Sequence, residues 1–139
     1  MSNLVQQLMR HEGYRQYSYT DTVGKLTIGV GRNLDDVGIS EDEAAYLLDN
    51  DILVARNELL FAFPAFSQMQ PVRQDALINM VFNMGITRFK GFKNMIGALV
   101  EQNYQLAADE MLDSKWARQV GSRADELAYQ MRTNSYTGD

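Results

Sequence analysis

The chain has 139 residues and a mass of 15.8 kDa, a length typical of one domain with its own hydrophobic core. Apolar residues make up 45% of the chain and charged residues 22%, which excludes a disordered or fibrous protein. The lack of cysteine and the single histidine exclude disulfides, thiolate zinc sites and multi-histidine metal sites. No apolar run approaches the ~20 residues of a membrane span.

The net charge of −5 is unevenly distributed along the chain. Residues 1–63 hold five basic and ten acidic residues, whereas residues 64–139 hold eight of each. Because there is no basic stripe, nucleic acid is not expected as a partner. The first residues, MSNLVQQLMRHEG, lack the charged start and long apolar stretch of a signal peptide. We therefore expect synthesis in the cytosol, no use of the ordinary secretion route and no stable membrane association.

The predicted elements begin with a helix and a small sheet. Residues 3–11 place their apolar side chains on one helical stripe, which Gly13 ends. Residues 14–31 instead alternate apolar with small or polar residues around a turn-prone Thr-Val-Gly sequence at 22–24. This alternation predicts a small antiparallel sheet, and residues 33–38 are expected to form a loop.

A long helix is predicted after this loop. Ser40 and Glu43 have the spacing of a capping box, in which the two side chains bond each other's backbone N–H groups. Apolar residues then recur at helical spacing until Pro64 ends the pattern. At about 1.5 Å per residue, a helix over about 40–63 extends some 30 Å or more.

The remainder of the chain is predicted to be helical. Pro71 begins a third helix and Gly85 ends it. A proline is well tolerated in the first turn of a helix, where its missing N–H would have no partner within the helix. Shorter helical patterns follow at about 92–101, 103–113 and 122–133. These elements predict an α+β fold that is mostly α.

Three residues of the first half could carry chemistry, although each has an ordinary structural explanation. Glu12 lies at the negative end of a helix dipole, where a carboxylate is a poor local choice; it could also be a surface residue relieved by neighbouring cations. Asp21 could simply bond its own backbone in a turn, and Thr27 could be a β-branched strand residue. Trp116 is expected in the core rather than on a ligand-binding surface.

Four sequence segments together resemble the phage-type lysozymes of glycoside hydrolase family 24. They are HEGYR at 11–15, YTDTVG at 19–24, LTIGVGR at 26–32 and ALINMVFNMG at 76–85. The resemblance keeps the family's order and covers nearly the whole chain. Its most specific part is the spacing of Glu12, Asp21 and Thr27.

The resemblance implies a role for each of these residues. Glu12 matches the general acid that protonates the glycosidic oxygen, Asp21 matches the second carboxylate, and Thr27 matches the threonine that helps hold the attacking water. Arg123 matches an arginine that pairs with the catalytic glutamate. The substrate-binding residues expected on this basis are Asn33, Phe82, Asn83 and Arg123, and neither a metal nor an organic cofactor is implied.

The resemblance also implies a single lysozyme domain over residues 1–139, with a lysozyme-like fold of two lobes. The N-terminal lobe, about 12–50, holds the sheet, and the helix over about 40–63 links it to a helical C-terminal lobe. That second lobe comprises about 64–139 together with helix 3–11. The polysaccharide is expected in the cleft between the lobes.

The function implied is that of a muramidase, a glycoside hydrolase that cleaves the β-1,4 bond between N-acetylmuramic acid and N-acetylglucosamine in peptidoglycan. We expect general acid/base catalysis with inversion, by a monomer that a phage uses for host cell lysis. The protein would accumulate in the host cytoplasm and reach the periplasmic wall through a separate holin-type membrane pore. The alternatives are a lytic transglycosylase, a non-catalytic peptidoglycan-binding module of a virion, and a virion-borne lysozyme used during infection.

Overall fold

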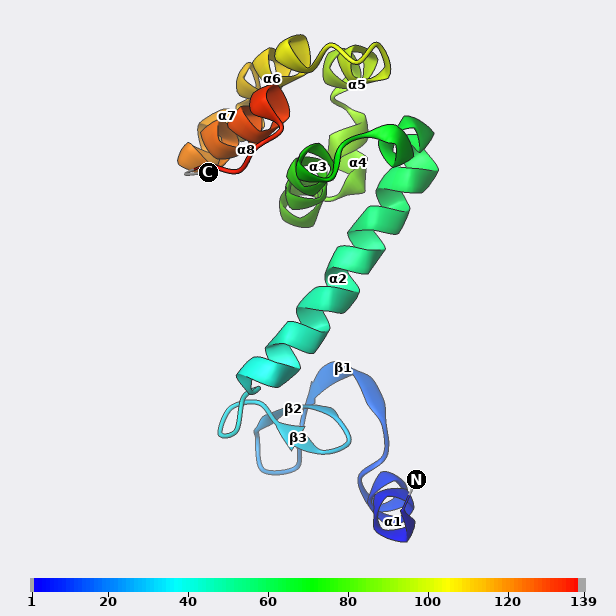
Figure 1. The fold of residues 1–139 in the computed structure, drawn as a ribbon. Coiled ribbons are helices and arrows are strands. Elements are labelled where there is room, and N and C mark those ends of the chain that lie inside the picture. Colours follow the sequence, from blue (N-terminus) through cyan, green and yellow to red (C-terminus); the bar gives the residue numbers. More distant parts are fainter. Residues whose placement is uncertain (1, 138–139) are drawn as a thin grey trace. The chain divides into compact units, whose positions relative to one another are not determined.

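The computed structural model describes residues 2–137 and divides the chain into two compact units, Met1–Leu47 and Leu48–Asp139. The boundary between them falls within α2 (Glu41–Ala62), a helix of 22 residues drawn in cyan to green in Figure 1. The helix predicted over about 40–63 is therefore confirmed.

The N-terminal unit begins with α1 (Asn3–Glu12). The hydroxyl of Ser2 accepts a hydrogen bond from the backbone N–H of Val5 at 3.1 Å and so caps the first turn. Gly13 ends the helix with a φ of +73°, a conformation that favours glycine. The helix predicted over 3–11 is confirmed, with one further residue at its end.

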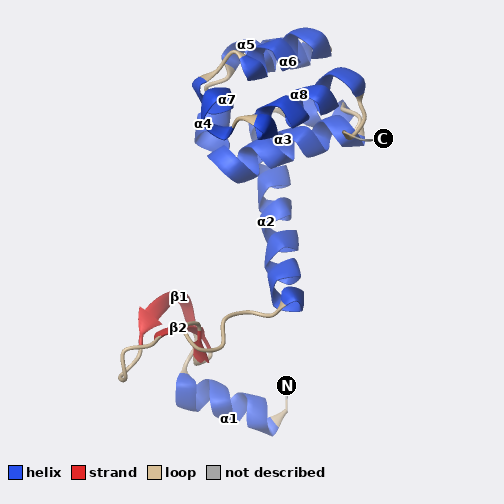
Figure 2. Cartoon of the chain, turned by 90° about the vertical axis from the view of Figure 1, so that its left-hand side faces the viewer, coloured by secondary structure: helices blue, strands red, loops and turns tan. Residues whose placement is uncertain are grey.

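An antiparallel sheet of three strands follows, in the order β1 (Arg15–Thr20), β2 (Leu26–Gly29), β3 (Arg32–Asn33). In Figure 2 the sheet follows directly after α1. Tyr19 pairs with Thr27 across β1 and β2, as the alternation predicted. β3 was not predicted, because two residues are too few to show an alternating pattern.

The start of α2 is tied to the sheet by a shared carboxylate. Glu43 forms the predicted capping box with Ser40, since each backbone N–H donates to the other's side chain at 2.9 and 3.1 Å. The same carboxylate accepts a hydrogen bond from Nη1 of Arg32 at 2.9 Å and forms an ion pair with Nη2 at 2.7 Å. The Arg32 bond is the main reason why the pKa of Glu43 falls to about 2.

The C-terminal unit is helical throughout its regular structure. A 3₁₀ turn, Pro64–Gln68, leads to α3 (Pro71–Met84), which begins at a proline and ends at a glycine as predicted. The remaining helices are α4 (Ile86–Lys90), α5 (Lys93–Val100), α6 (Tyr104–Leu112), α7 (Lys115–Val120) and α8 (Ser122–Thr133). The helices α4 and α7 were not predicted, because five or six residues are too few to show helical periodicity.

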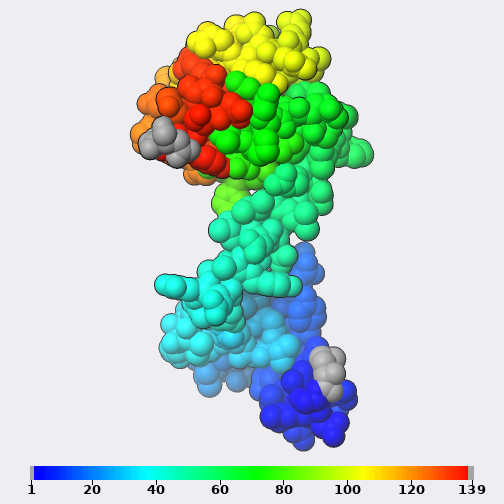
Figure 3. Space-filling model, in the orientation of Figure 1, coloured from blue at the N-terminus to red at the C-terminus, as the bar shows by residue number. Residues whose placement is uncertain are grey.

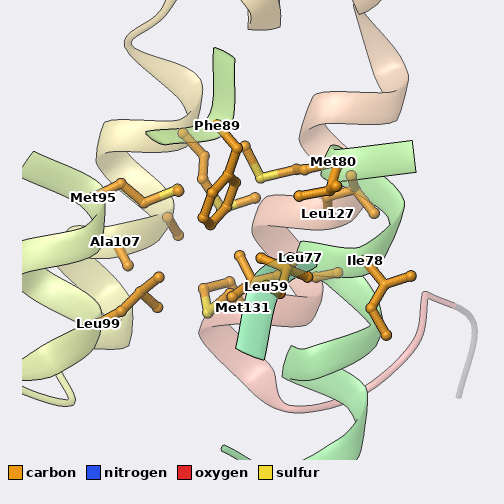
Figure 4. Packing of buried hydrophobic residues seen from close by; sticks show 14 of the residues in the cluster. Leu59, Leu77, Ile78, Met80, Phe89, Met95, Leu99, Ala107, Leu127 and Met131 are labelled. Carbon is orange, nitrogen blue, oxygen red and sulfur yellow. The ribbon is translucent and has the colours of Figure 1, made fainter. Parts of the chain in front are cut away.

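The hydrophobic core of this unit forms where α3 packs against α8, two segments that lie side by side in Figures 1 and 3. Leu77, Met80 and Met131 are completely buried there (Figure 4). Trp116 is also buried, with 1% of its surface exposed, so its predicted core position is confirmed. The other fully buried large side chains include Leu59, Phe66, Phe89, Met95, Met111 and Leu127.

These elements confirm the predicted α+β, mostly helical, lysozyme-like fold. Within residues 2–137, no helix is both long enough and apolar enough to span a membrane.

Candidate active site

Glu12 is the last residue of α1, and its exposed side chain runs alongside the backbone of Gly31. A Cβ atom at position 31 would lie 2.8 Å from Glu12 Oε2 and 3.0 Å from its Cδ. Real Cβ atoms essentially never approach other atoms this closely. The turn after β2 therefore brings a residue without a side chain against the candidate general acid.

Asp21 lies in the turn between β1 and β2. Its Oδ1 atom accepts hydrogen bonds from the backbone N–H groups of Val23 and Lys25, at 3.0 and 2.8 Å. This arrangement is the turn geometry expected of an ordinary aspartate, and it also fixes the carboxylate in one orientation. Within the described residues, the second oxygen, Oδ2, accepts no hydrogen bond.

Thr27 lies on β2 and is 3% exposed. Its hydroxyl donates to the carbonyl oxygen of Lys25 at 3.0 Å, and the backbone N–H of Asp21 donates to the same oxygen at 2.8 Å. One carbonyl group therefore holds the hydroxyl of Thr27 and the backbone of Asp21. Because the hydroxyl proton is committed to that carbonyl, the lone pairs of Thr27 Oγ1 can accept a hydrogen bond from a further partner.

The amide of Asn33, a predicted substrate-binding group, is engaged within its own loop. Asn33 Nδ2 donates to the carboxylate of Asp36 at 3.0 Å, and Asn33 Oδ1 accepts from the backbone N–H of Asp36 at 2.9 Å. Asp36 also pairs with Lys25 at 3.2 Å. The loop thus holds Asn33 in place, and one amide hydrogen remains for a ligand.

In the C-terminal unit, Phe82 and Arg123 line one groove, which has a volume of about 440 Å³. Phe82 projects from α3 and is 48% exposed, and Arg123 comes from the first turn of α8. Two nitrogens of the Arg123 guanidinium donate to Asn79 Oδ1, at 2.9 and 2.7 Å. The predicted pairing of Arg123 with Glu12 stays a prediction, since the two residues belong to different units.

Asn83 does not line this groove, although it follows Phe82 on α3. Its Oδ1 atom accepts the indole N–H of the buried Trp116 at 2.9 Å. A buried indole N–H needs such a partner. Asn83 therefore has a structural function. Its predicted contact with substrate stays a prediction.

A second groove of the C-terminal unit, of about 250 Å³, is lined by charges of both signs. The basic residues Arg88, Lys93 and Lys115 face it, and so do the acids Glu110 and Asp113. The aromatic rings of Phe92 and Trp116 meet edge to face in the same lining, 6.4 Å between centroids. The groove offers contacts to a ligand that carries both signs of charge.

The structure thus distributes the predicted site residues over the two units. Glu12, Asp21, Thr27 and Asn33 belong to the N-terminal unit, and Phe82, Asn83 and Arg123 belong to the C-terminal unit. Sequence reasoning did not single out Gly31, Asn79 or the backbone of Lys25. Of these, only Gly31 had a signal in the sequence, because it is a glycine of the segment LTIGVGR at 26–32. A glycine in such a motif often marks a place where the backbone approaches another group closely.

Comparison with known proteins identifies the family of this chain. The sequence model of the phage lysozyme family matches residues 9–133, which span every predicted site residue. The chain belongs to the phage lysozyme family. A member of this family is a glycoside hydrolase of the lysozyme type, and peptidoglycan is its substrate.

Individual phage lysozyme relatives match over most of the chain. The chain is 27% identical to "Probable T4-type lysozyme 1" of Dictyostelium discoideum, over 97% of this chain and 96% of that protein. It is 31% identical to the "Endolysin" of Salmonella phage P22, over 80% of each. It is also 26% identical to the "Pre-baseplate central spike protein Gp5" of Enterobacteria phage T4, over 90% of this chain and 27% of that protein.

Proposed function

We propose that this phage lysozyme hydrolyses the β-1,4 bond between N-acetylmuramic acid and N-acetylglucosamine with inversion at the anomeric carbon. Glu12 transfers its carboxyl proton to the glycosidic oxygen as the bond from the anomeric carbon to that oxygen breaks. A water molecule forms the new bond to this carbon from the opposite face, and Asp21 takes the proton that the water loses. No other group is needed to balance the reaction.

The anchoring of Asp21 and Thr27 on one peptide group carries this proposal. A water that attacks a sugar must be oriented by two acceptors, so that a lone pair faces the anomeric carbon. The Oδ2 atom of Asp21 supplies one acceptor, and the Oγ1 atom of Thr27 supplies the other because its own proton is held by Lys25. Both groups are thus oriented before substrate binds.

The substrate contacts of the C-terminal unit follow the same logic. Phe82 offers an exposed ring on which a sugar can pack, and Arg123 lies in the same groove with its guanidinium held by Asn79. We propose these two residues, with Asn33 and Asn83, as substrate-binding residues. The groove of mixed charge supports binding of peptidoglycan, whose stem peptides carry charges of their own.

The deciding experiment is muropeptide release from purified Gram-negative cell walls, with the wild type beside Glu12→Gln and mass analysis of the products. Hydrated reducing ends from the wild type alone are expected. Anhydro products would instead show a lytic transglycosylase. Retained wall binding without release would show a binding module. Proton NMR of fresh product tests the stereochemistry, since inversion of a β-linkage releases the α-anomer first.

We also propose that the protein lyses the host of a phage from within, accumulates in the host cytoplasm and needs a separate holin-type pore to reach the wall. The resemblance to a protein named endolysin supports this role. Expression in a Gram-negative host should cause lysis only when a pore-forming protein is co-expressed. The match to a protein named central spike protein favours a second role in the virion, which mass spectrometry of purified particles would detect.

A further inference from the structure

Two glycines, Gly29 at the end of β2 and Gly31 in the turn after it, have similar positive φ angles but different surroundings. Gly29 has a φ of +67° and Gly31 a φ of +69°. A Cβ atom at Gly29 would meet no atom within 4 Å, whereas one at Gly31 would meet Oε2, Cδ and Cγ of Glu12 at 2.8, 3.0 and 3.1 Å. The two positions therefore share the strain that a side chain would cause, and only Gly31 touches Glu12.

We propose that Gly31 is a positioning residue for Glu12: its lack of a side chain leaves the space in which the carboxyl group lies. The inference rests on the proposed role of Glu12 as general acid. Gly31 does not contact the reacting atoms. It acts only through Glu12, whose carboxyl group occupies the space that a side chain at position 31 would fill.

The geometry indicates how a methyl group at position 31 would act. The nearest atom is the end of a flexible side chain, so the protein can fold while Glu12 moves aside. Rotation of the carboxyl group about its last bond would not be enough, because Cδ and Cγ, at 3.0 and 3.1 Å, must also give by a few tenths of an ångström. The carboxyl group must therefore shift as a whole from the position in which the structure holds it.

The kinetic test compares Gly31→Ala with Gly29→Ala, its matched control, on soluble muropeptide chains. We expect Gly31→Ala to lower kcat by about tenfold or more, because the added methyl group displaces the carboxyl group of Glu12. KM should stay near the wild-type value, because uniform substrate binding is not removed. Gly29→Ala should keep the wild-type kcat. Equal kcat values for the two variants would overturn the proposal.

A stability measurement tests the contact without relying on activity. Both alanine variants are strained by the positive φ, so both should lower the Tm. Gly31→Ala should lower it further in the wild type, and this excess should disappear in the Glu12→Ala background, where the overlapping atoms are gone. The loss caused by Gly29→Ala should be the same in both backgrounds. An excess that persists in Glu12→Ala would show that the methyl group meets something else.

The two tests separate the inference from the proposed function. If Glu12→Gln is inactive and Gly31→Ala keeps its kcat, the positioning role is wrong while the role of Glu12 stands. If Glu12→Gln is fully active, the role of Glu12 as acid is wrong, whatever the stability cycle shows about the contact.

Discussion

The backbone N–H of Asp21 and the hydroxyl of Thr27 donate to the same atom, the carbonyl oxygen of Lys25. A carbonyl oxygen has two lone pairs and can accept both bonds. The two residues are separated by five residues of a tight turn, yet one carbonyl holds the backbone of Asp21 and the hydroxyl of Thr27. This shared anchor supports the proposed role of Asp21 and Thr27 in orienting a water molecule.

The first prediction concerns the charge of Asp21. Asp21→Asn keeps an oxygen that can accept from Val23 and Lys25, so the fold and the Tm should change little. The amide cannot take a proton from water, so kcat should fall by about 10²–10⁴-fold. Steady-state kinetics on cell walls checks this. Asp42→Asn removes the same charge from an exposed position of the same unit and should retain activity; comparable losses for both variants would point to a general charge effect.

The second prediction concerns the hydroxyl of Thr27. Thr27→Val keeps the shape of this buried side chain, and the Lys25 oxygen still accepts from Asp21. Stability should therefore be close to that of the wild type, while kcat falls at least about tenfold, equivalent to about 1.4 kcal/mol of activation free energy. Thr27→Ser should restore most of the rate, because it returns the acceptor. Full activity of the valine variant would remove Thr27 from the mechanism.

The third prediction concerns the pH dependence of stability. The hydrogen bond from Arg32 lowers the pKa of Glu43 to about 2, whereas an unfolded glutamate has a pKa of about 4.3. The stabilisation by ionised Glu43 is therefore complete above about pH 4.3 and is lost as the pH falls through about 2.

Urea unfolding at several pH values between 6 and 2 checks this third prediction, because this range includes both pKa values of Glu43. In this window the free energy of unfolding of the wild type should fall more steeply than that of Glu43→Gln. Glu41→Gln, a change in the same helical turn without the Arg32 bond, should keep the wild-type slope. Identical slopes for wild type and Glu43→Gln would contradict the expectation.

The fourth prediction concerns Asn83 and Trp116. Asn83→Ala leaves the buried indole N–H without its acceptor, which should destabilise the protein by about 1–3 kcal/mol. Trp116 is the only tryptophan, so its fluorescence during urea unfolding reports on the change directly. A loss of activity without this loss of stability would instead favour Asn83 as a substrate-binding residue with little structural role.

The fifth prediction concerns Met80 in the core. Its side chain is fully buried between α3 and α8 (Figure 4), so Met80→Ala should reduce the free energy of unfolding by about 2–5 kcal/mol. Val100→Ala, at a position 59% exposed in the same unit, is the control and should change it much less. Chemical denaturation of both variants makes the comparison.

The sequence determined the elements whose signals are local. Ser40 and Glu43 predicted the start of α2, and Pro71 and Gly85 predicted both ends of α3, because capping side chains, proline and glycine act within a few residues of themselves. The helices α4 and α7 were missed because each is too short to show a periodic pattern of apolar residues. The resemblance to the phage lysozymes named Glu12, Asp21 and Thr27 as candidates and Arg123 as the partner of Glu12, but it carried no information on the hydrogen bonds of Asp21 and Thr27.

Only the tertiary structure decided how the candidate residues are used. The hydrogen bond from the Trp116 indole N–H to Asn83 and the contact of Gly31 with Glu12 join residues that are far apart in the chain. The carbonyl of Lys25 joins Asp21 and Thr27 within one turn. No periodicity or motif encodes these contacts, since each depends on the path of the backbone. The sequence by itself therefore determined which groups are present, and the folding of the chain decided which atoms of those groups remain available for chemistry.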